Sequence, residues 1–391
     1  MRIGLLSPSI YMSPTSYSNM IFAPRDLVVA LADGLTDHGH EVHFFTAPDI
    51  KTKAFLIGGD QDLLQKEFIE EKLKGKPDER LKWGSFYAVK KYYEMDLTEK
   101  CYKMAIDGKL DIVHSYHDSL AHFSNEMTQF PTVYTLHDPL PTNENNLSYW
   151  LLNKFKHHNY ISISNVFRKN KNLHLNFIDT VYHGINIAKY KNILTNKSYM
   201  AFIGRMVPEK GIDSAIKAAK ITKNPIKIAT SSMSENKNIP YYRDFVEPLL
   251  NNSLVSLIGF MEGEEKIKFL ANASCLLFPI KWEEPFGMVM IEAMACGTPV
   301  IAYNRGSVPE IVRDGVTGFV IDPDDEDRPG KGSWIIKKKG VEGLVEAVKR
   351  IGEIDRKNCR KHVEENFSVE KMVEGYEKVY QKVIASQSNM S

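Results

Sequence analysis

Residues 284–300 of the chain have the sequence EPFGMVMIEAMACGTPV. Pro285 suits the entry of a helix but not its interior, and Gly287 lets a ligand approach the backbone closely. All residues from 288 to 295 are good or acceptable helix formers, and the Gly-Thr-Pro that begins at Gly297 ends the run. We therefore predict a short apolar helix with a glycine at its start.

Two carboxylates accompany this helix. Glu284 precedes its entry, and Glu292 lies about a turn and a half inside it. The first turn of a helix can bind an anion, because its N–H groups are free and the positive end of its dipole lies there. Glutamates at this spacing also occur on ordinary solvated helices. This helix is apolar enough to be buried, however, and a buried Glu292 needs a partner. A diphosphate at the N–H groups, with sugar and ribose hydroxyls on the two glutamates, fits a nucleotide sugar.

A second informative segment, residues 198–211, has the sequence SYMAFIGRMVPEKG. It predicts a strand that ends at Gly204, a loop that carries Arg205 and Lys210, and then an amphipathic helix. Two fixed cations beside a strand end can stabilise an anionic leaving group. An ordinary basic turn would have the same composition. The functional interpretation of this segment therefore depends on its occurring together with the apolar helix predicted further along the chain.

Both segments resemble the donor site of retaining GT-B glycosyltransferases, in the large family numbered 4. The resemblance covers nearly all of the second half of the chain and only scattered positions in the first. It implies that Arg205 and Lys210 face the donor diphosphate. It also implies that Glu284 holds hydroxyls of the sugar and that Glu292 holds the ribose. The donor-binding residues that it implies are Gly204, Met261, Phe286, Gly287, Met288, Val289 and Glu292.

Strand-like runs alternate with amphipathic helices in both halves, which predicts an α/β protein with two Rossmann-like, doubly wound domains of the GT-B type that face a cleft. We place the first domain at residues 1–185 and the nucleotide-sugar domain at residues 186–366. Residues 367–391 form a C-terminal helix that, in the family, crosses back onto the first domain. Residues 51–110 are expected to be helical and partly solvated. Strands are expected at residues 3–6, 41–46, 112–114, 132–136, 160–163, 180–182, 199–203, 226–230, 255–258, 274–278, 300–302 and 318–321.

The first domain is expected to bind the acceptor. His137 follows a strand, at the sheet edge where ligands bind, and the resemblance implies that it lies close to the donor sugar. His117 follows the preceding strand and is a second candidate, although either histidine could be structural. Asp138 could contact acceptor or sugar, or simply begin a turn. Tyr11 and Tyr17 lie in a loop without glycine, where many family members have a glycine pair, and we expect them to shape the acceptor pocket or to pack locally.

Composition narrows the choice of function. The chain has 391 residues, 43% of them hydrophobic, which is enough for two domains with full cores. A net charge of +1 disfavours nucleic acid as a partner and slightly favours a soluble acceptor over a lipid-linked one. The four cysteines have no metal-binding spacing, no apolar run approaches the ~20 residues of a membrane span, and the first residues do not form a signal peptide. We expect a cytoplasmic protein, with peripheral attachment to the inner face of the membrane left open.

Cofactors are not expected. Neither half has the glycine-rich dinucleotide loop after its first strand, which disfavours NAD and FAD. The acidic run at residues 322–327 has the composition of a solvated loop, and no metal site is predicted.

The sequence thus predicts a retaining glycosyltransferase that transfers a hexose from a nucleotide diphosphate sugar to a hydroxyl acceptor by front-face transfer. UDP-sugars are favoured as donors and GDP-mannose is the second choice. The catalytic candidates are His137, Arg205, Lys210 and Glu284. Two alternatives stay open: a nucleotide-sugar epimerase of the same fold, which needs no acceptor, and a catalytically silent nucleotide-sugar-binding protein.

Overall fold

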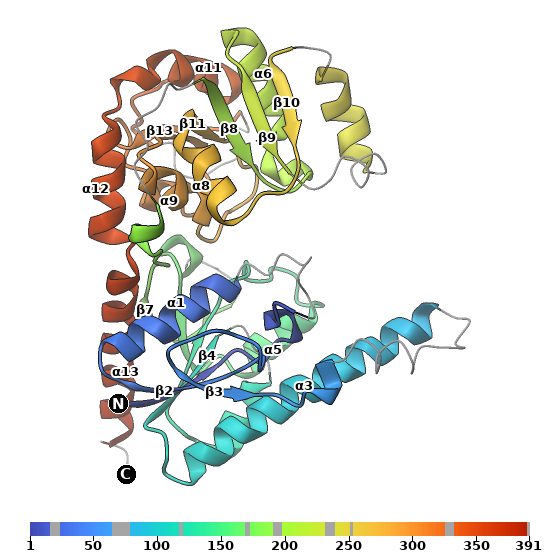
Figure 1. The fold of residues 1–391 in the computed structure, drawn as a ribbon, viewed down its shortest axis with the longest axis vertical. Coiled ribbons are helices and arrows are strands. Elements are labelled where there is room, and N and C mark those ends of the chain that lie inside the picture. The colour runs from blue at the N-terminus through green and yellow to red at the C-terminus, as the bar shows by residue number, and fades with distance from the viewer. Residues whose placement is uncertain are drawn as a thin grey trace. The chain divides into compact units, whose positions relative to one another are not determined.

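The computed structural model of the chain (Figure 1) folds into two units. Unit 1 contains Met1–Ile163, Arg168–Tyr182 and Val369–Ser391, and unit 2 contains Ser164–Phe167 and His183–Ser368. The structure describes residues 1–15, 24–64, 79–116, 120–168, 173–190, 198–230, 239–250, 253–324 and 332–388.

The sheet of unit 1 has seven parallel strands in the order β3-β2-β1-β4-β5-β6-β7. All residues of β4 and β5 are buried, because helices cover both faces of the sheet. The strands are β1 (Arg2–Leu6), β2 (Glu41–Thr46), β3 (Phe55–Gly58), β4 (Ile112–Tyr116), β5 (Thr132–Thr135), β6 (Asn159–Ser162) and β7 (Phe177–Thr180). The helices named below are α1 (Pro24–Asp37), α3 (Glu79–Ile106), α4 (Ala121–Thr128), α5 (Leu147–Lys154) and α13 (Val369–Ser388).

The last helix, α13, belongs to unit 1 although unit 2 precedes it in the chain. It packs against α1 at Gly34, where an added Cβ would lie 2.8 Å from Val373. The buried ring of His114 in β4 lies 2.7 Å from the hydroxyl of Tyr380 in α13. Its other nitrogen lies 2.7 Å from Thr135 in β5, which in turn bonds to Tyr376 of α13. The predicted packing of the C-terminal helix on the first domain is confirmed.

The sheet of unit 2 has six parallel strands in the order β10-β9-β8-β11-β12-β13. The strands are β8 (Tyr199–Ile203), β9 (Ile226–Ala229), β10 (Val255–Ile258), β11 (Ala273–Phe278), β12 (Val300–Tyr303) and β13 (Gly318–Ile321). The helices are α6 (Ile212–Thr222), α8 (Gly263–Ala271), α9 (Met288–Ala295), α10 (Val308–Ile311), α11 (Gly340–Arg350) and α12 (Arg356–Asn366). Two doubly wound parallel sheets are the fold class that the sequence predicts.

Two local predictions were wrong. Residues 51–110 were expected to be helical, but β3 (Phe55–Gly58) lies within them, ahead of α3. This strand is a four-residue apolar run, FLIG, at the edge of the sheet, and none of its residues is fully buried. A run this short does not distinguish a strand from part of a helix. The strand expected at residues 180–182 is β7, which lies at Phe177–Thr180, again at an edge.

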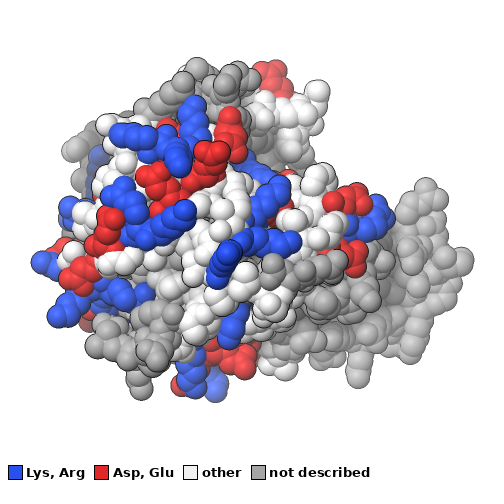
Figure 2. Space-filling view, turned by 90° about the horizontal axis from the view of Figure 1, so that it is seen from above, with Lys and Arg blue, Asp and Glu red and all other residues white. Residues whose placement is uncertain are grey.

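Charged side chains of both signs are interspersed over the described residues of the face shown in Figure 2. This distribution agrees with the formal net charge of +1. The described part of this face therefore does not present a broad field of one sign to a charged partner. No helix in the described residues has the length and apolar content needed to cross a membrane.

Candidate active site

The predicted apolar helix is α9, and Gly287 immediately precedes it. Gly287 has φ +83°, in the left-handed region, and an added Cβ would lie 2.6 Å from the end of the Met290 side chain. Glycine is therefore favoured here chiefly by the backbone, because the end of the Met290 side chain could move aside. Met288 and Val289 form the first turn of the helix, as predicted.

The backbone before α9 is held by the loop after β12. The amide of Ser307 donates to the carbonyl oxygen of Glu284 at 2.9 Å, and its hydroxyl donates to that of the buried Phe286 at 2.7 Å. Gly306 has φ +54°, and a Cβ there would overlap backbone atoms of Glu284. These contacts fix the backbone of Glu284, and they therefore define the point from which its side chain extends.

The carboxylate of Glu284 has two partners within unit 2. Nζ of Lys210 lies 2.9 Å from its Oε2, and Nε1 of Trp282 donates to the same oxygen at 3.0 Å. Lys210 also lies over the Trp282 ring, 4.9 Å from its centroid. The side chains of Lys210 and Glu284 are only 15% and 12% exposed. Two residues predicted separately, from motifs far apart in the sequence, thus form one ion pair.

Lys210 and Arg205 occupy the loop between β8 and α6. Gly211 ends this loop with φ +70°, and a Cβ there would overlap the carbonyl oxygen of Pro279, which follows β11. The loop is therefore pressed against the segment that leads to Glu284. The side chain of Arg205 is exposed and forms no hydrogen bond or ion pair within the described residues. Gly204 adjoins Lys210, since its added Cβ would lie 3.4 Å from Lys210 Cγ.

A second ion pair joins α9 to α8. Glu292 is 8% exposed, and its Oε1 lies 2.7 Å from Nζ of Lys266 and 3.4 Å from the hydroxyl of Tyr190. The partner that a buried Glu292 requires is thus supplied, at least for one oxygen, by the chain itself. Met261, one of the predicted donor-binding residues, lies in the segment between β10 and α8.

Lys281, just before Trp282, is anchored to α6. Its Nζ lies 2.8 Å from Oδ1 of Asp213, which also accepts a 2.8 Å hydrogen bond from Tyr241. Burial by itself raises the pKa of Asp213, but the hydrogen bonds from Lys281 and Tyr241 outweigh this and lower it. The segment that carries Trp282 and Glu284 is therefore fixed at both ends.

Unit 1 contains a pocket of about 600 Å³ beside the ends of β4 and β5. Two predicted acceptor-side residues, Tyr11 and Asp138, line it together with the catalytic candidate His137. The His137 ring lies 4.3 Å from that of Tyr116. Burial raises the pKa of Tyr11. The other two acceptor-side candidates, His117 and Tyr17, lie outside the described residues.

Charged side chains from α3 also line this pocket. Glu94 is 7% exposed, and its carboxylate lies 2.7 Å from Nζ of Lys91 and 3.7 Å from Nζ of Lys90. Lys90 also lies over the ring of Tyr11, 4.8 Å from its centroid. Sequence reasoning missed the contact between this charged group and Tyr11, because the loop after β1 and helix α3 are far apart in the chain.

Sequence reasoning also missed Lys266, Trp282 and Tyr190, the neighbours of the two glutamates. Trp282 lies two positions before Glu284 and could have been noticed as a flanking aromatic. The pairing of Lys266 with Glu292 depends on the packing of α8 against α9, for which the sequence contains no local signal.

Residues 186–331 match the family described as Glycosyl transferases group 1. This segment of the chain thus matches the same family that its motifs resemble. A relative from Methanocaldococcus jannaschii, described as an uncharacterized glycosyltransferase, is 33% identical over 209 residues. These residues are 52% of this chain and 53% of the relative. The chain thus spans about half the length of the curated relatives it matches.

Solved structures share the fold over the whole chain. Sucrose-phosphate synthase from Thermosynechococcus elongatus has a TM-score of 0.70 and 19% identity, with 99% of this chain and 100% of that one covered. Anabaena HepE, solved in complex with UDP-glucose, has a TM-score of 0.60 and 17% identity, with both chains fully covered at 100%. At these identities the similarity shows the GT-B fold and nothing more specific.

Proposed function

We propose that this protein is a retaining glycosyltransferase that transfers a hexose from a nucleotide diphosphate sugar to a hydroxyl acceptor. The observation that carries the proposal is the pairing of Lys210 with Glu284 at 2.9 Å, ahead of the glycine-led helix α9. A cation for phosphate and a carboxylate for sugar hydroxyls lie side by side there. The match of residues 186–331 to the glycosyl transferases of group 1 supports the same function.

Donor binding is assigned to unit 2. The N–H groups of Gly287, Met288 and Val289 bind the diphosphate, since they lie at the start of α9. Glu292 accepts the ribose hydroxyls, because a carboxylate has acceptor positions beyond the one used by Lys266. Lys210 has three N–H donors and can contact phosphate while it remains paired with Glu284. UDP-sugars are favoured over GDP-mannose, and HepE, a protein of the same fold, was solved with UDP-glucose.

Transfer takes place on one face of the sugar. The bond between the anomeric carbon and the phosphate oxygen breaks, and the acceptor oxygen forms the new bond on the same side. The acceptor proton passes to the departing phosphate oxygen, so a strong protein base is not required. Arg205 and Lys210 stabilise the charge that grows on the diphosphate in the transition state. Glu284 orients the sugar through its hydroxyls.

Acceptor binding is assigned to the pocket of unit 1. Its lining combines aromatic, imidazole and carboxylate groups at Tyr11, His137 and Asp138. These groups suit the hydroxyls and ring faces of a polar acceptor, and a soluble acceptor is favoured over a lipid-linked one. His137 is assigned the position nearest the transferred sugar.

Donor screening tests the proposal. Calorimetry with UDP-glucose, UDP-galactose and GDP-mannose identifies the nucleotide, and the preferred donor is then incubated with a panel of acceptors. We expect nucleotide diphosphate release that depends on acceptor, and a product whose anomeric configuration, read by NMR, equals that of the donor. An epimerised sugar without acceptor would make the protein an epimerase. Binding without turnover across the panel would favour the silent binding protein, and an inverted product would refute the retaining mechanism.

A further inference from the structure

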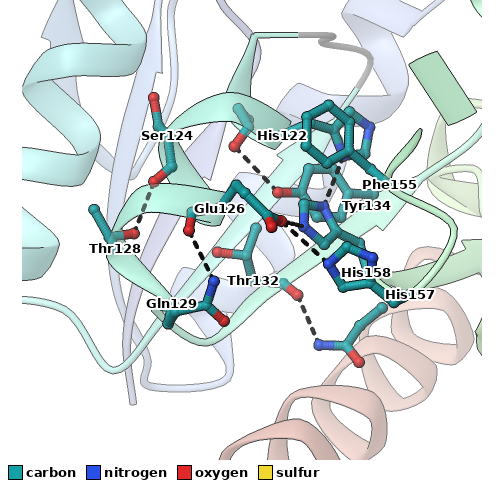
Figure 3. Close-up of polar contacts among 12 residues, drawn as sticks. His122, Ser124, Glu126, Thr128, Gln129, Thr132, Tyr134, Phe155, His157 and His158 are labelled. Atoms are coloured by element: carbon teal, nitrogen blue, oxygen red, sulfur yellow. Dashed lines mark hydrogen bonds and ion pairs between the residues drawn. The ribbon is translucent and has the colours of Figure 1, made fainter. Parts of the chain in front are cut away.

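Unit 1 contains a group of metal-ligand side chains that plays no part in the proposed transfer. Glu126 lies in α4, and His157 and His158 form the turn between α5 and β6. Oε2 of Glu126 lies 3.1 Å from Nε2 of His157 and 3.2 Å from Nε2 of His158. All three atoms lie within 4.8 Å of one another. Figure 3 shows the Glu126 carboxylate facing both imidazole rings.

We propose that Glu126, His157 and His158 bind a zinc ion. Zinc binds imidazole nitrogen and carboxylate oxygen at about 2.0–2.2 Å in a tetrahedral arrangement, so that neighbouring ligand atoms lie about 3.3 Å apart. The two distances from Glu126 already match that separation. Two imidazoles and one carboxylate form a ligand set common for zinc, with a fourth position open to water.

The ring of His158 is held in place by a further layer of contacts. Its side chain is only 5% exposed, and its second nitrogen, Nδ1, lies 2.9 Å from Nδ1 of His122. The ring also stacks on Tyr134, with centroids 5.2 Å apart, and on Phe155, with centroids 5.1 Å apart. Metal-binding histidines usually have such a partner on the second nitrogen, which fixes the ring and leaves the first nitrogen for the ion. This buried support distinguishes the group from a chance cluster of surface side chains.

The other two proposed ligands, Glu126 and His157, are accessible from solvent. The side chains of Glu126 and His157 are 47% and 60% exposed. An ion can therefore enter from solvent without opening the core. Binding would tie the end of α4 to the turn before β6. His158 of that turn contacts His122, and His122 lines the pocket of unit 1. The bound zinc would thus clamp this side of the pocket.

Hydrogen bonds alone also join these three residues, so the test must detect the metal itself. The full chain is freed of metal with a chelator and titrated with Co²⁺, whose visible absorption is intense only in a tetrahedral site, and then with Zn²⁺. We expect one tetrahedral Co²⁺ per chain, displaced by Zn²⁺, and no competition from Mg²⁺. Glu126→Gln and His157→Ala change exposed residues and should each weaken Zn²⁺ binding on the order of tenfold or more.

A matched control exists in the same unit. His38 and His40 lie 3.1 Å and 2.8 Å from Oε1 of Glu377, which is another histidine–glutamate contact. His38→Ala should leave the Co²⁺ spectrum and the Zn²⁺ affinity unchanged. Zn²⁺ should also raise the melting temperature of the wild type but not that of Glu126→Gln. Absence of tetrahedral absorption in the wild type, or equal Zn²⁺ affinity in His157→Ala, would overturn the proposal. Loss of binding in His38→Ala would do the same.

Discussion

Units 1 and 2 have the same kind of sheet, but their candidate sites are held by different means. In unit 2 the backbone itself fixes the site. Gly211 and Gly306 both have positive φ, and a Cβ on either would overlap the backbone of a neighbouring segment. In unit 1 the pocket is lined by side chains from separate elements, and Glu94 pairs there with Lys90 and Lys91.

The candidate site of unit 2 is therefore the more rigid of the two, and the pocket of unit 1 is the more adaptable. A site built on close backbone contacts tolerates few substitutions, because each contact restricts both the dihedral angles and the side-chain volume. A pocket lined by side chains can change its ligand by substitution without disturbing the sheet. In the proposed function, unit 2 binds a donor of fixed chemistry and unit 1 binds the acceptor, so each construction suits its task.

The largest effect is expected at Gly306. Gly306→Ala should lower the free energy of unfolding by about 3 kcal/mol or more, because the substitution combines positive φ with a clash against Glu284. Gly263→Ala is the matched control, since Gly263 has the same φ of +54° and nothing within 4 Å of an added Cβ. It should cost about 1–2 kcal/mol. Urea denaturation measures both variants, and equal losses would mean that backbone contact does not fix the site.

Arg205 tests whether the exposed cation of unit 2 acts in transfer. Arg205→Ala should lower turnover about a hundredfold, or about 2.7 kcal/mol, because the lost charge acts on the transition state. Its melting temperature should not change, since the side chain is exposed. Lys210→Ala should lose similar turnover and also some stability, because Glu284 loses its ion pair. Lys268→Ala, at an exposed lysine of α8, is the control. Near-normal turnover in both Arg205→Ala and Lys210→Ala would mean that the diphosphate is bound elsewhere.

The free energy of unfolding should fall at acid pH because of a buried histidine in the core of unit 1. Burial lowers the pKa of His114 from 6.5 to about 3. Below pH 6.5 the unfolded chain takes up a proton on this ring and the folded chain does not, until pH reaches about 3. The folded state therefore loses up to about 1.4 kcal/mol per pH unit in this window.

Denaturation of the wild type and His114→Gln across that window measures the effect. The slope of unfolding free energy against pH should be smaller in the variant. His174→Gln, at an exposed histidine of the same unit, should keep the wild-type slope. Equal slopes in the wild type and His114→Gln would show that His114 takes up its proton in the folded state as readily as in the unfolded chain.

The same contrast explains how far the sequence could be read. Helix α9 was predicted because Pro285 and Gly287 mark its start within a short segment. The strand before Gly204 was predicted because a short apolar run ends there in glycine. Strand β3 was missed because it is short, lies at an edge and has no fully buried residue. The ion pair between Lys266 and Glu292 was missed because it arises only when two helices pack together.

The histidines of unit 1 illustrate the same limit. Glu126 and His158 are over thirty positions apart in the chain. Helix α4 and the turn before β6 come together only because of the order of the strands in the sheet. No spacing rule for metal ligands connects them, so the cluster could not be found from the sequence. The side chains that line the pocket were partly predicted, because Tyr11 and His137 follow the first and fifth strands, at the edge where ligands bind.

The smallest expected effect separates the two glutamates of unit 2. Glu292→Gln should weaken binding of free UDP or GDP about tenfold, since it removes a charged acceptor for the ribose that nucleotide and nucleotide sugar share. Glu284→Gln should leave nucleotide affinity nearly unchanged and lower mainly the transfer rate, because its proposed ligand is the sugar. Calorimetry with nucleotide alone, followed by kinetics with the full donor, measures both.

Each variant keeps the shape of the side chain and changes one charge, so each is the control for the other. Both also lose an ion pair of similar exposure, with Lys266 in one case and Lys210 in the other. A general loss of stability should therefore affect the two alike, and a difference in nucleotide affinity reports the ligand contact. If Glu284→Gln loses nucleotide binding while Glu292→Gln keeps it, the two roles are reversed. The backbone-held site of unit 2 would then bind its donor in the opposite direction along α9.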